Sequence, residues 1–341
     1  MFTKTTIIDI ARELNINPGT VSRALNNHPA ISESTKNAVR IVAGKLNYRQ
    51  NKIASSLRLG RSNIIGVIIP SAEINFFGSV VHGIEKIANE RGYNILIYQS
   101  NEESEQEIKG VETFLRARVD GIMGSIAKST TQYDHFLEIK KRGTPLVLFD
   151  RADDELGVPS VVVDDYKGAY KATEHLVQQG CRRIAHIGGQ SHIKIFKDRL
   201  RGYKDALKAN GLRVIPELIV YGNVTIESGK TCMEQLLNTP VKPDGVFAVE
   251  DFTALGAMQL LKEKHIKIPQ EIAIIGFANE AFSEYITPSL STVDQQTVKM
   301  GESAAHLFFE LLRTDSFYKI VPPKTVLEPV LIFRDSSLRS K

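Results

Sequence analysis

The chain has 341 residues, of which 42% are hydrophobic and 24% charged, and its formal net charge at pH 7 is +4. This length suits two or three domains, and the composition is that of a soluble globular protein. No stretch approaches the ~20 apolar residues of a membrane span, and the first residues lack the apolar core of a signal peptide. Two cysteines, Cys181 and Cys232, are too few for a disulfide framework. We therefore expect a cytoplasmic protein with free thiols and no membrane contact.

The charge is unevenly distributed along the chain. Residues 1–62 contain ten Lys and Arg against three Asp and Glu, which gives a net charge of +7. The remaining 279 residues contain 33 basic against 36 acidic side chains, a net charge of −3. A small basic head on a mildly acidic body favours a polyanionic partner for the head. The alternative interpretation is a solvated basic surface.

The first predicted helix begins after Thr6, with Asp9 placed to reach back to Thr6 as in a capping box. Its apolar residues recur at helical spacing: Ile7, Ile10, Ala11 and Leu14. The segment 15–17 then breaks the pattern with two asparagines. Asparagine tolerates the left-handed conformation that a tight turn between helices requires. The first helix should therefore end in a three-residue turn.

Two further helices follow this turn. Asn17 caps the second, and Pro18 occupies its first position, where a missing N–H costs nothing. Its inward residues are Val21, Ala24 and Leu25. Ser32 caps the third helix, whose apolar face consists of Val39, Val42, Ala43 and Leu46. Three short helices of which the first two are joined by a tight turn predict a helix-turn-helix.

The second helix carries a polar face suited to a DNA major groove. The residues outside its apolar face are Pro18, Gly19, Thr20, Ser22, Arg23 and Asn26. An arginine here can read guanine O6 and N7, and the short hydroxyls reach bases or phosphates. A three-helix protein-binding module is the alternative.

Four motifs occur in order in this region: Asp9-Ile10-Ala11, Thr20-Val21-Ser22-Arg23-Ala24-Leu25-Asn26, Ile31-Ser32 and Leu46-Asn47-Tyr48. In this order they resemble the head of the lactose/galactose repressor family. The resemblance implies a DNA-binding domain over residues 1–50 and a hinge over 51–62 that becomes helical on operator DNA. The DNA contacts that it implies are Thr6, Ile7, Asn17, Pro18, Gly19, Thr20, Ser22, Arg23, Asn26, Ser32, Thr35, Asn51, Ala54 and Leu57.

In that family a hinge leucine wedges into the minor groove and kinks the duplex, and Leu57 stands in the matching position. The alternative role for Leu57 is that of a buried linker anchor. Two residues depart from the family pattern: Gln50 stands where many members have Pro, and Asn15 where many have Gly. Pro18 and Gly19 offer little side-chain chemistry for reading bases, so these positions do not predict the operator sequence.

From residue 63 onward, short apolar runs alternate with amphipathic stretches. The predicted strands are Ile64–Pro70, Tyr93–Tyr98, Gly121–Ser125, Pro145–Asp150, Arg183–Gly188, Leu218–Tyr221, Gly245–Val249 and Ile272–Phe277. The predicted helices cover residues 76–91, 104–118, 131–142, 166–180, 197–210, 226–238 and 252–264. Two rounds of this alternation predict an α/β fold with two lobes of doubly wound parallel sheet.

The family resemblance extends through the body. It rests on Asp165 through His175-Leu176, Arg183-Ile184-Ala185, Arg199-Leu200-Arg201-Gly202-Tyr203, Ala254-Leu255-Gly256-Ala257 and Ile275-Gly276-Phe277. The family's sensor domain is similar to periplasmic sugar-binding proteins, whose chain passes three times between two lobes. The resemblance implies passages near Val163, Ser291 and Lys324. The expected lobes are 63–163 with 292–323 and 164–291 with 324–335, followed by a tail over 336–341.

Because open α/β sheets bind ligands at their strand ends, a small-molecule effector should bind between the lobes. The candidate ligand residues are Phe76, Phe77, Ser125, Asp150, Arg199, Val224, Glu250 and Asn279. The resemblance marks Arg199 as the ligand-gripping arginine and Val224 as the position of a frequent aromatic platform. Three alternatives remain: Asp150 pairs with Arg151, Phe77 belongs to the core, and Arg199 ties the lobes by a salt bridge.

The candidate site departs from the family pattern at three positions. Glu250 replaces a usual Asn, Ala278 stands where sugar-binding members often have an Asp, and Val224 removes a stacking surface. The expected effector is a sugar or sugar derivative, and a sugar acid or an oligosaccharide fragment stays open.

Other motifs give no sign of catalysis. Gly188-Gly189-Gln190 fits no dinucleotide or phosphate-loop pattern, the histidines lack metal-ligand spacing, and no nucleophile motif is present. We expect no cofactor, no metal and no enzymatic activity.

The expected function is a homodimeric, effector-controlled transcription regulator on a pseudo-palindromic operator, with repression expected ahead of activation. Two rivals from other classes remain. A solute-binding protein would need a signal peptide and no basic head. An enzyme with an accessory DNA-binding head would need a nucleophile and a base in the cleft.

Overall fold

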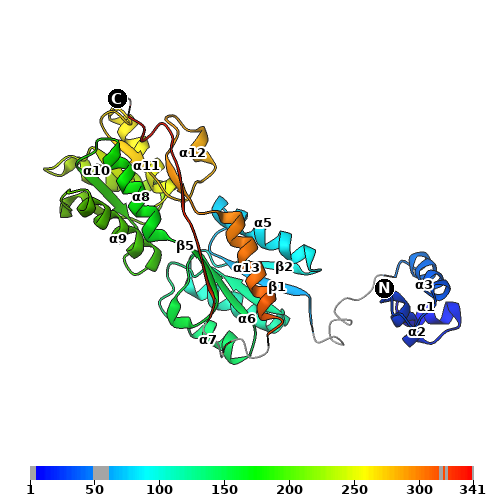
Figure 1. Ribbon diagram of the computed structural model, residues 1–341. Helices are drawn as coiled ribbons and strands as arrows, with labels where there is room; N and C mark the ends of the chain where they lie inside the picture. The colour runs from blue at the N-terminus through cyan, green and yellow to red at the C-terminus, as the bar shows by residue number, and fades with distance from the viewer. Residues whose placement is uncertain (1–4, 49–60, 315–317, 319–321, 340–341) are drawn as a thin grey trace. The chain divides into compact units, whose positions relative to one another are not determined.

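The computed structural model describes residues 5–48, 61–314, 318 and 322–339. The chain divides into two compact units, residues 1–62 and 63–341 (Figure 1), and each is described by itself. Over the described ranges, no helix is both long and apolar enough to cross a membrane.

The head is a bundle of three short helices. These are α1 (Ile7–Leu14), α2 (Pro18–Leu25) and α3 (Glu33–Lys45). Their core contains Ile10, Ala11, Val21, Ala24, Val39 and Ala43. Asn15 ends α1 in the left-handed conformation, with a φ of 52°, and so allows the sharp turn into α2. The predicted helix-turn-helix is therefore confirmed, including its turn.

The first lobe of the body is built on a six-stranded parallel sheet with the order β11-β5-β4-β3-β1-β2. Its strands are β1 (Ile64–Ile69), β2 (Asn94–Gln99), β3 (Gly121–Gly124), β4 (Leu146–Phe149), β5 (Ser160–Val163) and β11 (Lys324–Leu327). Its helices are α5 (Asn75–Glu90), α6 (Ser104–Ala117), α7 (Asp134–Lys141) and α13 (Thr297–Leu311), with a short 3-10 turn η1 (Asp154–Leu156).

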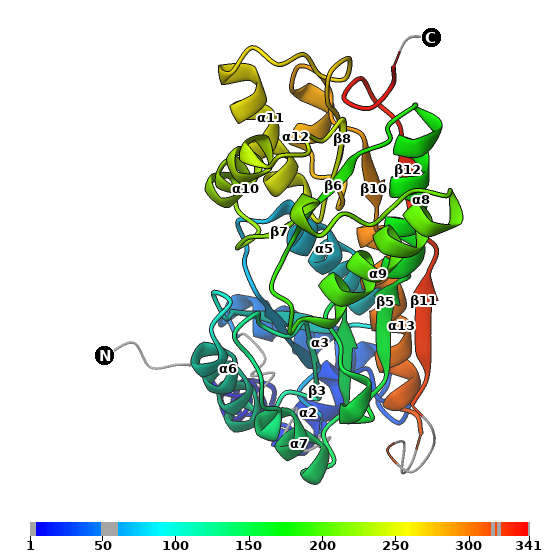
Figure 2. The same cartoon turned by 90° about the vertical axis from the view of Figure 1, so that its left-hand side faces the viewer.

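Helices cover both faces of this sheet, which explains why its four central strands, β5, β4, β3 and β1, are almost continuously apolar. Alternate residues of β1 point to opposite faces: Val67 packs with α5 and α13, and Ile68 packs with Phe114 of α6 and Phe136 of α7. Figure 2 shows the first lobe below the second, with β5 and β11 running side by side.

The second lobe contains a four-stranded parallel sheet with the order β7-β6-β8-β9. Its strands are β6 (Ile184–Gly188), β7 (Ile219–Tyr221), β8 (Gly245–Ala248) and β9 (Ala273–Ile275). Its helices are α8 (Asp165–Gln178), α9 (Lys194–Ala209), α10 (Ile226–Asn238), α11 (Asp251–Glu263) and α12 (Phe282–Tyr285), with a 3-10 turn η2 (Pro216–Leu218). The helices again cover both faces, so the prediction of two doubly wound lobes is confirmed.

At two places the chain crosses between the lobes a few residues later than the sequence predicts. Lys324–Leu327 was expected in the second lobe, but it pairs with β5 as an edge strand of the first sheet. Thr292–Asp294 was expected in the first lobe, but as β10 it pairs antiparallel with β12 (Val330–Ile332) and bridges to Ala278 beyond β9. Buried backbone N–H and C=O groups need hydrogen-bond partners. Each segment therefore stays paired with its neighbouring strand for a few residues beyond the predicted boundary.

Glycines allow the closest helix pair of the first lobe to form. A Cβ on Gly301 of α13 would lie 2.0 Å from the carbonyl oxygen of Val80, and one on Gly83 of α5 would lie 2.2 Å from that of Val298. Two glycines at facing positions let the two helix backbones touch, which positions α5 over the sheet.

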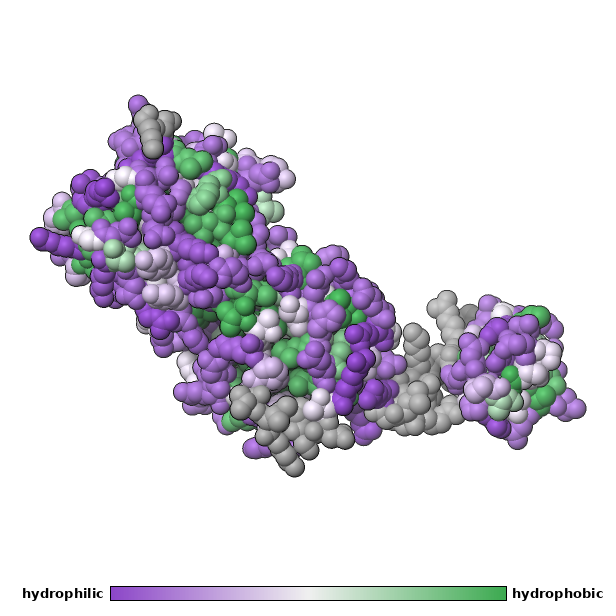
Figure 3. Space-filling model, in the orientation of Figure 1, coloured by the Kyte–Doolittle hydropathy of each residue, from purple (hydrophilic) through white to green (hydrophobic). Residues whose placement is uncertain are grey.

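The surface of the body is mainly hydrophilic in the view of Figure 3, with small apolar areas. Two exposed apolar residues, Leu96 and Ile97, lie on β2 and keep 43% and 52% of their surface accessible. β2 is an edge strand, and within the described parts of the chain only β1 pairs with it.

Candidate functional site

Hydrogen bonds at the two helix starts hold the head's turn in place. The carboxylate of Asp9 accepts from the backbone N–H and the hydroxyl of Thr6, both at 2.8 Å, and these bonds lower the pKa of Asp9. The side chain of Asn17 accepts from Gly19 N–H at 2.7 Å. The direction of α2 therefore follows from two caps that the sequence predicts.

The predicted reading face of α2 is accessible. Arg23 and Asn26 are exposed, and Thr20 and Ser22 are half-buried. Arg23 Nε donates to Gly19 O at 3.3 Å, and Asn26 Nδ2 donates to Ser22 O at 2.8 Å. These side chains lie along their own helix and would have to exchange these bonds for contacts to bases.

The other predicted DNA contacts of the head lie at helix starts. Thr6 is exposed before α1, and Ile7 packs at the edge of the head's core. Ser32 caps α3 by accepting from Thr35 N–H at 3.3 Å. Helix N-termini offer N–H groups and a positive dipole to a phosphate. The predicted hinge contacts Asn51, Ala54 and Leu57 lie outside the described residues.

In the body, the strand ends of the two lobes converge on a narrow cleft with a cavity volume of about 60 Å³. Of the predicted ligand residues, the cleft is lined by Phe76, Phe77, Asp150, Arg199, Val224 and Glu250. Asp150 follows β4 directly, and Glu250 caps α11 just after β8. The parallel sheets thus bring residues that are a hundred positions apart to one place.

Arg199 is held rigidly at the floor of this cleft. Its guanidinium bonds Asp165 at 2.7 Å and the carbonyl of Val249 at 2.6 Å, and it lies 3.6 Å from the ring centre of Phe277. A longer bond of 3.3 Å reaches Gln295 in the segment that crosses between lobes. Asp165 begins α8 of the same lobe, so the salt bridge of Arg199 does not tie the lobes together.

Asp150 is a buried carboxylate with few partners. Ser125, itself fully buried, donates to it at 3.3 Å, and Arg151 Nε lies 3.9 Å away. Arg151 instead makes two bonds to Glu102, at 2.7 and 3.1 Å. Burial raises the pKa of Asp150 above its usual value. A ligand hydroxyl donated to Asp150 would satisfy an oxygen that the protein leaves underused.

Lys128 and Glu250 bring a basic and an acidic side chain to the cleft. Burial lowers the pKa of Lys128, whose Nζ lies 3.5 Å from Glu102. Burial, reinforced by the neighbouring Asp251, raises the pKa of Glu250 well above its usual value. Glu250 also accepts from Phe252 N–H at 2.8 Å, which leaves its other carboxylate oxygen for a ligand.

Glu280 joins the two lobes at the rim of the cleft. Its carboxylate accepts from the N–H of Phe76, in the first turn of α5, at 3.3 Å. The loop that carries it is held by the buried Asp251, which accepts from Glu280 N–H, Ser283 and Thr292 at 2.7 to 2.9 Å. Burial raises the pKa of Glu280 to about 7. The cleft is therefore closed in part by one hydrogen bond to a titratable group.

Aromatic rings form the apolar walls. Phe76 and Phe77 of α5 meet edge-on, with ring centres 5.0 Å apart, and Phe196 and Phe252 line the opposite lobe. Phe77 is 2% exposed and belongs to the core, and it also lines the cleft. Flat apolar rings beside carboxylate acceptors suit a ligand with many hydroxyls and an apolar ring face.

Asn279 is not brought to the cleft, contrary to the prediction. Its Nδ2 donates to Asp294 at 3.0 Å, and its Oδ1 accepts from Arg334 at 3.0 Å. Both partners lie in the segments that cross between the lobes. The backbone of Asn279 is in the left-handed conformation, with a φ of 55°, where the chain turns away from the cleft.

Comparison with known proteins agrees with this arrangement. Residues 6–51 match bacterial regulatory proteins of the lacI family, and residues 173–337 match the periplasmic binding protein-like domain. The HTH-type transcriptional regulator RegA of Clostridium saccharobutylicum is 32% identical over 98% of this chain and 99% of its own length. The chain belongs to the lacI family of bacterial regulatory proteins.

Solved structures of lacI-family regulators share the architecture. A complex of the transcriptional regulator CelR with cellobiose is 26% identical, covers 97% of this chain and 99% of its own, and has a TM-score of 0.73. The lac repressor dimer bound to operator and an anti-inducer has a TM-score of 0.88 over 99% of this chain and 100% of its own. At 23% identity the latter shows the fold alone. As a lacI-family member, the chain is a DNA-binding transcription regulator.

Several residues that line the cleft of this lacI-family chain were not predicted from its sequence. They are Ile74, Lys128, Ile195, Phe196, Phe252, Glu280 and Gln295. Lys128 and Glu280 follow the ends of β3 and β9 by a few residues, so a wider window after each strand would have found them. Gln295 could not be found in this way, because it enters the cleft through a crossing segment.

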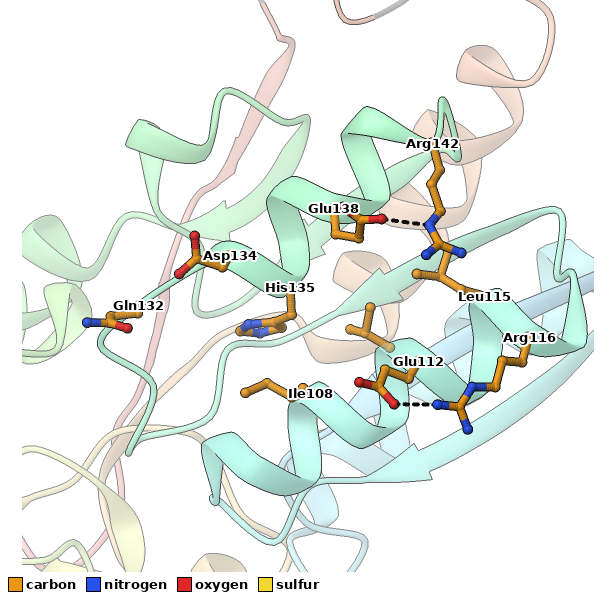
Figure 4. Close-up of a pocket in the computed structure, with 10 residues that line it drawn as sticks. Ile108, Glu112, Leu115, Arg116, Gln132, Asp134, His135, Glu138 and Arg142 are labelled. Carbon is orange, nitrogen blue, oxygen red and sulfur yellow. Dashed lines mark hydrogen bonds and ion pairs between the residues drawn. The ribbon is translucent and has the colours of Figure 1, made fainter.

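A second hollow of the lacI-family body lies between α6 and α7 of the first lobe (Figure 4). Its charged side chains pair along their own helices: Glu112 with Arg116 at 2.9 Å and Glu138 with Arg142 at 2.8 Å. Because these charges are already compensated, we do not assign a ligand to it. Among the described residues, no group of three or more His, Cys, Asp or Glu is arranged to hold a metal ion.

Proposed function

We propose that this regulator is a cytoplasmic homodimeric repressor whose operator affinity is set by a carbohydrate-derived effector bound between the lobes. The observation that carries the proposal is the convergence of Asp150, Arg199 and Glu250 with aromatic rings in one cleft. Carboxylates accept from sugar hydroxyls, and rings pack on the apolar face of a sugar. The cellobiose bound by the similar regulator CelR supports this class of effector.

The proposal includes two copies of the head on a pseudo-palindromic operator, each inserting α2 into the major groove. The hinge contacts Asn51, Ala54 and Leu57 belong to this proposal. The open edge of β2 with its exposed Leu96 and Ile97 offers a surface for a second copy. We propose no catalysis. The carboxylates of the cleft identified above serve as hydrogen-bond acceptors, and its cationic side chains already interact with neighbouring groups.

The test begins with a thermal-shift screen of carbohydrates on the full chain, since a ligand of the native state raises its melting temperature. A hit is then titrated during operator binding, measured by fluorescence anisotropy. The test variant is Asp150→Asn rather than Arg199→Ala, because removing Arg199 would leave Asp165 buried without its partner.

We expect Asp150→Asn to keep operator affinity and to bind the effector about tenfold or more weakly. The matched control is Glu234→Gln, which removes one surface charge from α10. Effector binding that is equal in wild type and Asp150→Asn would contradict the assignment of the cleft.

A further inference from the structure

A separate groove runs along α9 in the second lobe, between this helix and the edge strand β7, and has a cavity volume of about 360 Å³. We call it the α9 groove. The ring of Phe196 contributes to both the α9 groove and the interlobe cleft, so the two are neighbours. The function proposed above makes no use of the α9 groove.

A buried histidine with an unused acceptor lies at the base of the α9 groove. His186 on β6 is fully buried, and its ring lies between those of Tyr203 and Phe247, with both ring centres 5.1 Å away. Its Nδ1 lies 3.1 Å from the carbonyl oxygen of Phe247. A carbonyl only accepts, so Nδ1 carries the proton and Nε2 is an acceptor. Burial lowers the pKa of His186 to about 3, which keeps the ring neutral.

Nε2 of His186 has no hydrogen-bond partner within the described part of the chain. Leaving a buried acceptor unpaired costs free energy, and such groups in native proteins usually serve a ligand or a water. The missing donor would have to approach from the α9 groove, which His186 lines.

Gly188 keeps the approach to Nε2 open. It lies two residues after His186 on the same face of β6 and also lines the α9 groove. A Cβ at this position would lie 3.2 Å from Nε2 and 3.1 Å from the ring of Tyr221. Tyr221 is half exposed, so its ring has room to move aside and cover a ligand.

The helix side of the α9 groove carries four basic side chains and one acidic side chain, Asp205. Lys197, Arg201, Lys204 and Lys208 recur along α9 at helical spacing and all line the groove. Arg201 pairs with Asp198 at 3.1 Å and Lys208 with Asp205 at 3.7 Å. For Lys197 and Lys204, no ion pair is seen among the residues that the structure describes. Two ammonium groups are therefore available for an anion.

We propose that the α9 groove binds a small phosphate monoester whose sugar ring carries a free hydroxyl. Lys197 and Lys204 hold the phosphate through charge-assisted hydrogen bonds. The ring hydroxyl donates to Nε2 of His186, and Tyr221 covers the ring. The phosphate is held by the lysines of α9, so the site needs no dinucleotide-type glycine motif.

The test is isothermal titration of the full chain with ribose 5-phosphate, ribose and inorganic phosphate. We expect ribose 5-phosphate to bind at least tenfold more tightly than either fragment. The double variant Lys197→Gln with Lys204→Gln should lose at least tenfold in affinity. Lys262→Gln, an exposed lysine of α11, is the matched control and should bind as the wild type does. Asp150→Asn alters the interlobe cleft and not the α9 groove. It should therefore leave the affinity for ribose 5-phosphate unchanged.

The role of His186 has its own measurement. In a ¹⁵N spectrum of the histidine rings, Nε2 of His186 should shift on addition of ribose 5-phosphate and not on addition of phosphate. His186→Phe keeps a stacking ring and should lose the preference for ribose 5-phosphate over phosphate.

Adenosine 5′-monophosphate is titrated as well. Tighter binding than ribose 5-phosphate identifies a nucleotide as the ligand, and equal or weaker binding identifies a sugar phosphate. The proposal is overturned if none of these phosphates binds, or if inorganic phosphate binds as tightly as ribose 5-phosphate. It is also overturned if the double lysine variant still binds ribose 5-phosphate as the wild type does, or if Asp150→Asn no longer binds it.

Discussion

The carboxylates of the cleft differ in how far their charges are compensated. Asp165 has a close partner in Arg199, yet burial still raises its pKa to about 6. Among the described residues, Asp150 accepts from the Ser125 hydroxyl, with Arg151 Nε 3.9 Å away, and Glu280 accepts from the N–H of Phe76. Removing water from a carboxylate favours its protonated form unless a cation or several donors replace that water. The protonation of these carboxylates, and with it the charge at the cleft, therefore depends on pH.

Glu280 should make the body less stable as pH rises. Its folded-state pKa is about 7 against a usual value of 4.5, so the folded state holds a proton that the unfolded state has released between these values. The stabilisation is complete below 4.5 and is lost as pH rises through 7, with a slope of at most about 1.4 kcal/mol per pH unit. Urea unfolding of wild type and Glu280→Gln across this window measures the difference.

The difference between the two proteins isolates Glu280 from other titrating groups. Asp165 acts in the same direction, whereas burial lowers the pKa of His175 to about 4 and so destabilises the fold as pH falls below 6.5. Parallel pH profiles for wild type and Glu280→Gln would show that Glu280 titrates normally.

Arg23 is the residue of the head for which we predict base recognition. It is exposed on α2, and within the described residues its guanidinium donates to Gly19 of its own helix. Arg23→Ala should cost roughly 1–3 kcal/mol on the preferred operator and relax base choice at one position. A binding-site selection measures this, with Arg12→Ala, an exposed arginine on α1, as the charge-matched control. Unchanged base preference in Arg23→Ala would remove Arg23 from the reading face.

At the scale of elements, the packing of α5 on α13 depends on Gly301. Because an added Cβ would meet the carbonyl of Val80 at 2.0 Å, Gly301→Ala should push the helices apart and destabilise the body by about 1–3 kcal/mol. Gly78→Ala on α5 is the control: in the described part of the chain, no atom beyond its own stretch of helix lies within 4 Å of an added Cβ, so higher helix propensity should stabilise the body by up to ~1 kcal/mol. Chemical denaturation compares the two variants, and equal midpoints would show that the helices adapt freely.

Most elements up to β9 could be predicted from sequence because the buried strands are apolar runs and the helices have caps or an apolar stripe; β5 and α13 were not predicted. Lys324–Leu327 could not be predicted, since an edge strand of mixed polarity has no such run. Asn279 was predicted to line the cleft and does not, whereas Gln295 lines the cleft without having been predicted. The direction of each depends on hydrogen bonds to segments that cross between lobes, and these bonds have no local sequence signal.

At the scale of the whole molecule, the positive charge is concentrated in residues 1–62, which carry a net +7, while the rest carries −3. Operator binding should therefore weaken steeply with salt, because each phosphate neutralised changes the slope of log K against log salt by about −0.9. Fluorescence anisotropy at several salt concentrations gives this slope. Lys262→Gln in the body should leave it unchanged, and a slope near zero in the wild type would mean that the basic head is not the DNA contact.

The connection between the lobes bears on how the chain folds during synthesis. The parallel strands of the second lobe, β6 to β9, are contiguous in the chain, whereas the first sheet receives β11 only after residue 323 has been made. The second lobe can therefore assemble its sheet on the ribosome while the first still lacks α13 and its last edge strand. A nascent chain that stalls before α13 would leave the apolar face beneath α13 uncovered, and a chaperone would meet the first lobe rather than the second.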